Sequence, residues 1–242
     1  LYRQLYPFFD RTRIADSFSC RQNKGTHKAM GRFRVFSNKV SRNDTRTVWV
    51  LKCDIRKFFA SVDHDILLNF IRSSIADMDI VKLLAEIVGS FHSTQKGRGL
   101  PLGNLTSQLL VNIYMNEFDQ FVKHKLKTRY YVRYADDFVF LSDDKMVLEG
   151  ILPKISRFLQ EKLKLSLHPD KVFIKTLASG VDFLGWVHFP DHRTVRTVTK
   201  RRMYKRIEEM NGKEETVQSY LGLLRHGNAK KIKEIILSSL VP

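Results

Sequence analysis

The sequence contains little cysteine and no long apolar run, and each absence excludes a class of protein. Cys20 and Cys53 are too few for a disulfide framework and lack metal-ligand spacing, which fits a reducing cytosol. No apolar run approaches the roughly 20 residues of a membrane span, and no signal peptide follows Leu1. We therefore expect a cytoplasmic protein without a membrane partner. Because the chain begins at Leu1 rather than Met, we expect a fragment, with functional residues upstream.

Acidic residues are in the minority. The chain has 25 Asp and Glu against 42 Lys and Arg, which gives a formal charge of +17 and a pI of about 9.9. This surplus favours a polyanionic partner. An anionic membrane is the alternative, but no basic amphipathic helix stands apart from the rest, so we expect nucleic acid. The 242 residues, 43% of them apolar, can bury a substantial core in one large domain or two small ones.

Several enzyme signatures are also missing: the sequence has no P-loop, no Rossmann fingerprint and no supported Ser-His-Asp pattern. The patterns that are present predict helices over 27–39, 80–88, 106–127 and 145–162, a helix capped by Asp63, and a basic helical segment from 200 onward. They predict strands over 48–53, 130–134, 138–141, 172–177 and 181–189. This order indicates an α+β fold with an antiparallel sheet backed by helices.

Two adjacent carboxylates, Asp136 and Asp137, form the most informative feature. They lie at the turn between two aromatic, β-branched runs, and Asp54 ends a third strand-like run. Neighbouring like charges repel each other, and a bound divalent cation removes that cost. Taken alone, each aspartate is more simply interpreted as the cap of a strand end or as part of a solvated turn. Together, in a basic protein, they predict a two-metal phosphoryl-transfer site.

The sequence around these aspartates resembles the reverse transcriptase family. Residues 54–61 (DIRKFFAS) resemble its first catalytic motif and 134–137 (YADD) its second. Residues 98–108 (RGLPLGNLTSQ) resemble its template-and-nucleotide loop, and 183–186 (FLGW) its primer grip. The resemblance runs in collinear order from about Asp16 to Gly227.

The resemblance implies a right-hand fold and RNA-directed DNA synthesis. It implies partial fingers at 1–46, a palm at 47–190 and a thumb-like basic segment at 191–242, with the upstream fingers before Leu1. The implied cofactor is two Mg²⁺ ions, which Mn²⁺ can replace. The implied partners are an RNA template, a DNA primer or RNA–DNA duplex and dNTPs, and an accessory protein is left open.

The resemblance also implies roles for individual residues. Asp54, Asp136 and Asp137 would be catalytic metal ligands, assisted by the Ile55 carbonyl. The implied nucleotide-binding residues are Phe59 as a sugar gate, Pro101, Leu102, Gly103, Gln108, and Lys171 as a proton donor to pyrophosphate. The implied primer grip is Phe183, Leu184, Gly185 and Trp186. The candidate nucleic-acid contacts are Arg21, Lys24, His27, Arg98, Lys200, Arg201, Arg202 and Lys205, for which a solvated basic face is the alternative interpretation.

Leu102 departs from the glutamine that many members carry, and an aliphatic side chain cannot donate a hydrogen bond to the nucleotide. We therefore expect low fidelity. This loop, with residues 17–21 and 24–27, most resembles diversity-generating retroelement enzymes, and next group II intron enzymes. The sequence is also compatible with an antiviral-defence reverse transcriptase and with a non-catalytic RNA-binding module.

His188, Asp191 and His192 flank Pro190 without a fourth ligand, and we interpret them as structural.

Overall fold

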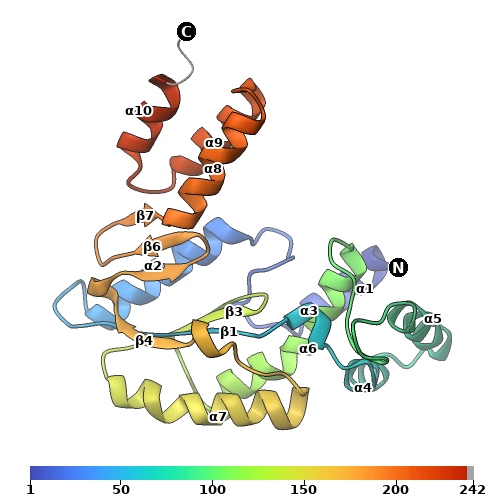
Figure 1. The fold of residues 1–242 in the computed structure, drawn as a ribbon. Helices are drawn as coiled ribbons and strands as arrows, with labels where there is room; N and C mark the ends of the chain where they lie inside the picture. Colours follow the sequence, from blue (N-terminus) through green and yellow to red (C-terminus); the bar gives the residue numbers. More distant parts are fainter. Residues whose placement is uncertain (239–242) are drawn as a thin grey trace.

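The computed structural model describes residues 1–238, which form helices around two small antiparallel sheets (Figure 1). The helices are α1 (Tyr2–Asp10), α2 (Thr26–Ser41), α3 (Phe58–Ser61), α4 (His64–Ser74), α5 (Met78–Gly89), α6 (Leu105–Gln120), α7 (Lys145–Leu163), α8 (Thr197–Glu209), α9 (Glu214–Leu224) and α10 (Lys230–Ser238). The strands are β1 (Trp49–Asp54), β2 (Tyr131–Tyr134), β3 (Asp137–Ser142), β4 (Phe173–Thr176), β5 (Val181–Phe183), β6 (Trp186–His188) and β7 (Arg193–Val195).

The larger sheet has the strand order β2-β3-β1-β4, with all neighbours antiparallel. Alternate residues of β1 face opposite sides, as the pleat requires. Leu51 and Cys53 lie in a core with α6 and α7, whereas Val50 lies in a second core with α2. Figure 1 shows α7 along one side of the sheet and α2 on the other. Helices thus cover both faces of the sheet.

The second sheet corrects one of the sequence predictions. A single strand over 181–189 is wrong, because Leu184 and Gly185 adopt positive φ values of 54° and 82° and form a two-residue turn. The chain therefore folds back as the hairpin β5–β6, and the short strand β7 pairs with β6. The predicted strand over 172–177 is confirmed as β4, which belongs to the larger sheet.

The predicted helices are present with adjusted ends. Side-chain caps fix several starts: Asp63 accepts a hydrogen bond from the Ile66 amide, and Asn104 accepts one from the Thr106 amide. The helix predicted over 106–127 instead ends as α-helix at Gln120 and continues as a π-helical turn over Phe121–Lys125. Helix α1 and strand β7 were not predicted.

The basic C-terminal segment folds as the helices α8, α9 and α10. They pack through a small core that includes Met203, Val217 and Leu224, and this core reaches Met30 of α2 and Trp186 of β6. The last four residues of the predicted segment 191–242, residues 239–242, lie outside the described residues. Within residues 1–238, no helix combines the length and apolarity that crossing a membrane requires.

Candidate active site

The pairing of β1 with β3 brings two of the three predicted aspartates together. Asp54 lies directly opposite Asp137, and the Ile55 amide donates a hydrogen bond to the Asp136 carbonyl at 3.3 Å. Opposed residues in an antiparallel pair have Cα atoms about 4.5–5.5 Å apart. Asp136 follows Ala135, which makes the tight turn with a φ of 55°. The three carboxylates therefore arise from adjacent positions at one end of the sheet.

Two lysines contact this acidic cluster, which we define as Asp54, Asp136 and Asp137. Lys52 has the same side-chain direction as Asp54, because the two residues are two positions apart on β1. Its Nζ lies 3.4 Å from Asp137 Oδ2. Lys171 is the last residue of a 3₁₀ turn at Pro169–Lys171. Its Nζ lies 3.1 and 3.3 Å from the two Asp54 carboxylate oxygens.

The electrostatics of the acidic cluster favour binding of a cation. Burial raises the pKa of Asp137 to about 7; the Lys52 ammonium opposes this shift, and the Asp54 and Asp136 charges add to it. Burial also raises the pKa of Asp136, and the Asp54 charge adds to the rise. Asp137 Oδ1 is buried and has no hydrogen-bond partner. Carboxylate oxygens are the donors that Mg²⁺ prefers, so these residue types suit the metal that the family resemblance implies.

The side chains are not arranged as a closed metal site. Among residues 1–238, no group of three or more His, Cys, Asp or Glu side chains is placed to hold a metal ion. The contacts give a physical reason, because Lys171 holds Asp54 and Lys52 holds Asp137. Lys171 contacts both carboxylate oxygens of Asp54, and Lys52 contacts one oxygen of Asp137.

A buried ion pair supports the hairpin that carries Asp136 and Asp137. Arg133 donates to both carboxylate oxygens of Asp119 on α6, at 2.8 and 2.6 Å, and both side chains are almost fully buried. Arg133 also donates to Ser17 Oγ and to the Ala135 carbonyl, each at 3.0 Å. The Tyr131 hydroxyl completes the network by donating to Asp119 at 2.8 Å. The hydrogen bond from Arg133 to its carbonyl thus holds the turn residue Ala135 in place.

The predicted nucleotide loop is attached to the segment that follows Asp54. The Leu100 amide donates to the Phe59 carbonyl at 2.8 Å, and the Gly99 amide donates to the Val62 carbonyl at 2.8 Å. His64 bonds this loop twice, through its amide to the Gly97 carbonyl at 3.0 Å and between Nε2 and the Gly99 carbonyl at 2.7 Å. The candidate gate and the loop therefore form one connected unit.

Within this unit the side chains differ in exposure. Leu102 is 77% exposed. Gly103 is exposed, whereas Pro101 and Gln108 are half-buried. Phe58 is buried in the core, as expected, and Phe59 is half-buried against it.

The predicted primer-grip residues form the β5–β6 hairpin. Phe183 and Trp186 are buried, whereas Leu184 and Gly185 form the turn. Trp186 belongs to the core of the C-terminal helices, and its ring lies against Gly227. The hairpin therefore joins the sheet region to that helical module.

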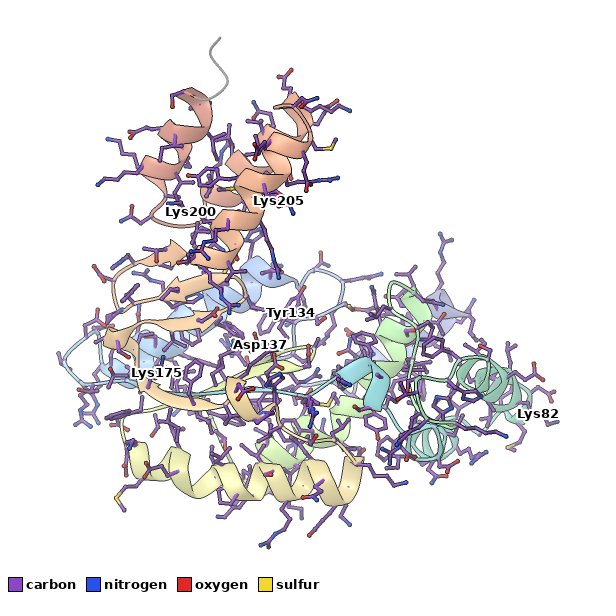
Figure 2. All side chains as sticks on the ribbon, in the orientation of Figure 1. Lys82, Tyr134, Asp137, Lys175, Lys200 and Lys205 are labelled. Carbon is purple, nitrogen blue, oxygen red and sulfur yellow. The ribbon has the colours of Figure 1, made fainter. Side chains whose placement is uncertain are left out.

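The candidate nucleic-acid residues fall into two groups. Arg201, Arg202 and Lys205 are exposed on α8, and Lys200 is half-buried beside the Tyr204 ring. In Figure 2, Lys200 and Lys205 lie above the sheet, on the same side as Tyr134 and Asp137 and away from α7. In this view the two labelled lysines of α8 and Asp137 lie on the side of the sheet away from α7.

The second group makes contacts within the protein. The Arg21 side chain is 7% exposed and donates to Asp10 at 2.7 Å, and Lys24 donates to the Ala15 carbonyl at 2.8 Å. His27 stacks on His226 with ring centroids 3.7 Å apart, and Arg98 Nε lies 3.8 Å from Asp63. Each of these four side chains thus has a partner within the protein.

His188, Asp191 and His192 make separate contacts. His188 Nε2 lies 3.1 Å from the Phe183 carbonyl, whereas His192 Nδ1 lies 2.7 Å from Asp191 Oδ1. His188 is buried, and Asp191 is exposed. These contacts agree with the structural interpretation made from the sequence.

Sequence reasoning missed three residues of the site: Lys52, Asp119 and Arg133. A sequence signal existed for Lys52, because a strand places residues two apart on the same face. No comparable signal linked Asp119 to Arg133, since their contact depends on how α6 packs against β2.

Comparison with known proteins identifies what the chain resembles. The family model described as Reverse transcriptase (RNA-dependent DNA polymerase) matches residues 2–188. Protein YkfC of Escherichia coli is 28% identical over 225 residues, covering 78% of this chain and 56% of that protein. The group II intron-encoded protein LtrA of Lactococcus lactis is 25% identical, covering 65% of this chain and 37% of that protein. The chain thus spans between about a third and just over half of these two relatives.

Solved structures with a similar fold include telomerases. An apo telomerase from Candida tropicalis, truncated from its C-terminal domain, has a TM-score of 0.64 at 14% identity, covering 81% of this chain and 45% of that chain. A telomerase from Candida albicans, in complex with a fragment of telomeric RNA, has a TM-score of 0.60 at 10% identity, covering 99% of this chain and 47% of that chain. At this identity the likeness concerns the fold, and it confirms the predicted α+β right-hand polymerase architecture.

Proposed function

This chain belongs to the reverse transcriptase (RNA-dependent DNA polymerase) family, and from that membership we propose that it carries the catalytic core of an RNA-directed DNA polymerase. The reaction is transfer of a deoxynucleotide from a dNTP to the 3′-hydroxyl of a primer paired with an RNA template. The single observation that carries the proposal is the placement of Asp54 directly opposite Asp137, beside Asp136, at one end of the sheet.

The acidic cluster is proposed to hold two Mg²⁺ ions, with the Ile55 carbonyl assisting. The support is the clustering of three partly buried carboxylates, one of which has a buried oxygen without a partner. When bound, these ions would activate the 3′-hydroxyl and neutralise the charge on the leaving pyrophosphate. Mn²⁺ has the same preference for oxygen donors and is expected to substitute.

The surrounding residues are proposed to position the substrates. The Phe59 ring would exclude a ribose 2′-hydroxyl, and residues 101–103 with Gln108 would contact the nucleotide and template. Lys171, whose ammonium already lies beside Asp54, would hold a proton at Nζ for the leaving pyrophosphate. The β5–β6 hairpin would position the primer end, and the exposed cations of α8 would contact duplex phosphates.

We also propose a division of the chain into the three subdomains of a right-hand polymerase. Residues 1–46 are proposed as partial fingers, 47–190 as the palm and 191–242 as the thumb. The core that joins Trp186 to α8, α9 and α10 supports a thumb attached through the primer-grip hairpin.

Two retroelement contexts remain as candidates. A diversity-generating retroelement enzyme is favoured by Leu102 and by the residues of its loop. A group II intron-type enzyme is favoured by the similarity to LtrA. A low-fidelity enzyme is expected in the first case. An antiviral-defence enzyme has no observation of its own in its favour.

A non-catalytic RNA-binding module is the rival of a different class. The formal charge of +17 suits it. The three clustered carboxylates oppose it, because they would repel the phosphates that such a module binds.

Primer extension on an RNA template tests the proposal. We expect Asp136→Ala to abolish extension in Mg²⁺ while the circular dichroism spectrum and gel-shift affinity stay unchanged, because this half-buried turn residue contributes little packing. Asp79→Ala, at an exposed carboxylate on α5, is the matched control and should extend normally. Extension by Asp136→Ala at the wild-type rate would refute the assignment, and RNA binding without extension by the wild type would favour the rival.

A further inference from the structure

Lys52 is a buried lysine in the middle of the sheet. It is 7% exposed, and its Nζ lies 3.4 Å from Asp137 Oδ2. Lysines are almost never buried to this extent unless they are paired, because removing an ammonium from water is costly. The position of Lys52 therefore requires a compensating negative charge, and Asp137 supplies it.

The strand register explains why Lys52 meets Asp137. Asp54 lies opposite Asp137, and Lys52 lies opposite Val139 on the same face. The long lysine side chain needs to reach only diagonally across the sheet, to the next position on that face. Its charge thus lies beside Asp137, on the face of the sheet that also carries Asp54.

The two lysines of the site differ in accessibility. The Lys171 side chain is 53% exposed, whereas the Lys52 side chain is 9% exposed. Lys171 belongs to a short 3₁₀ turn and can move into solvent when its partner binds something else. Lys52 extends from a central strand between β3 and β4 and has no such freedom. The acidic cluster therefore has one displaceable cation and one fixed cation.

We propose that Lys52 is a fixed internal counter-ion of the acidic cluster, which holds Asp137 in position before a divalent metal binds and weakens the attraction of that metal. The inference rests on the proposed function, because it takes the acidic cluster to be the metal site. Lys52 is a positioning residue: it acts on the metal through Asp137.

This role has a consequence that ordinary core packing does not share. If Lys52 and the metal both compensate the same carboxylates, each must partly replace the other in stabilising the protein. Removing Lys52 should then cost stability mainly in the absence of metal. A lysine that contributes only packing would cost the same with and without metal, because its contacts do not depend on the ion.

The test is thermal unfolding and Mn²⁺ binding of wild type, Lys52→Met and Lys175→Met at pH 8 and constant ionic strength. Lys175 is the matched control: it is an exposed lysine on β4, placed over Phe173 away from the acidic cluster (Figure 2). Without metal we expect Lys52→Met to melt below wild type. Mn²⁺ should raise its melting temperature more than that of wild type or Lys175→Met. Free Mn²⁺ measured by electron paramagnetic resonance should show roughly tenfold tighter binding by Lys52→Met, since one nearby positive charge is gone.

An equal Mn²⁺-induced rise in all three proteins, with equal affinities, would overturn the inference. If Lys52→Met does not fold without metal, Mn²⁺ should restore its circular dichroism spectrum, and failure to do so would also overturn it. Lys52→Arg keeps the charge and should respond to Mn²⁺ as wild type does. A response of Lys52→Arg like that of Lys52→Met would contradict the counter-ion role.

Mn²⁺ binding by two further variants, Asp54→Asn and Asp136→Ala, separates this inference from the proposed function. If Asp54→Asn and Asp136→Ala bind Mn²⁺ as tightly as wild type, the acidic cluster is not the metal site and both proposals fail. If these two variants lose Mn²⁺ binding while Lys52→Met keeps wild-type affinity and melting behaviour, only the inference about Lys52 fails.

Discussion

Replacing Asp119 with leucine should be among the most destabilising single changes to this protein. Asp119 is completely buried and accepts two hydrogen bonds from Arg133 and one from the Tyr131 hydroxyl. The substitution leaves the buried Arg133 guanidinium without its counter-charge and the Tyr131 hydroxyl without an acceptor. Breaking a buried pair in this way costs about 3–5 kcal/mol of unfolding free energy.

The structure supplies both a control and a rescue. Lys145 and Glu149 on α7 form an ion pair at 2.8 Å, close to the 2.6 Å of Arg133 and Asp119, but their side chains are 46% and 50% exposed. Lys145→Met should therefore cost no more than about 0.5 kcal/mol. The double variant Asp119→Leu, Arg133→Met removes both buried charges and should recover about 2 kcal/mol or more of the loss.

Urea unfolding followed by circular dichroism measures these differences. We expect the midpoint of Asp119→Leu to fall well below that of wild type, and the midpoint of the double variant to lie between them. A loss below about 1 kcal/mol for Asp119→Leu would show that the Arg133 charge finds another partner or solvent. A double variant no more stable than Asp119→Leu alone would refute the unpaired-charge explanation.

Three further predictions concern other parts of the molecule. Gly227→Ala should cost about 1–3 kcal/mol and lower the melting temperature, because its Cβ would overlap the Trp186 ring; Gly222→Ala on α9 meets nothing within 4 Å and should not destabilise. Burial lowers the pKa of His188 to about 4, against about 6.5 in the unfolded chain. Because the unfolded chain then binds the proton first, the free energy of unfolding should fall by about 2 kcal/mol as the pH is lowered from 7 to 5. His188→Gln should flatten this slope in urea titrations, and a wild-type slope would contradict the assignment to His188. Leu102→Gln should lower the misincorporation rate in sequenced extension products, and an unchanged rate would remove the rationale for low fidelity.

The sequence by itself determined the local elements and the kinds of residue at the site. Alternating aromatic and β-branched residues specified the strands around Asp136, because such side chains suit a half-buried pleated surface. Capping side chains such as Asp63 and Asn104 set helix starts, since they satisfy amides within their own first turn. The collinear motifs then indicated the family, and the family match confirms it.

Only the tertiary structure decided which of these residues meet. The opposition of Asp54 to Asp137 depends on strand register across more than eighty residues of intervening chain. The contacts of Lys52 with Asp137 and of Asp119 with Arg133 depend on the same long-range packing. The break between β5 and β6 depends on whether Leu184 accepts a left-handed conformation, which is uncommon for a leucine and is set by the surrounding fold. Local interactions thus determine the helices and strands. Burial and charge compensation between distant segments determine which side chains meet at the site.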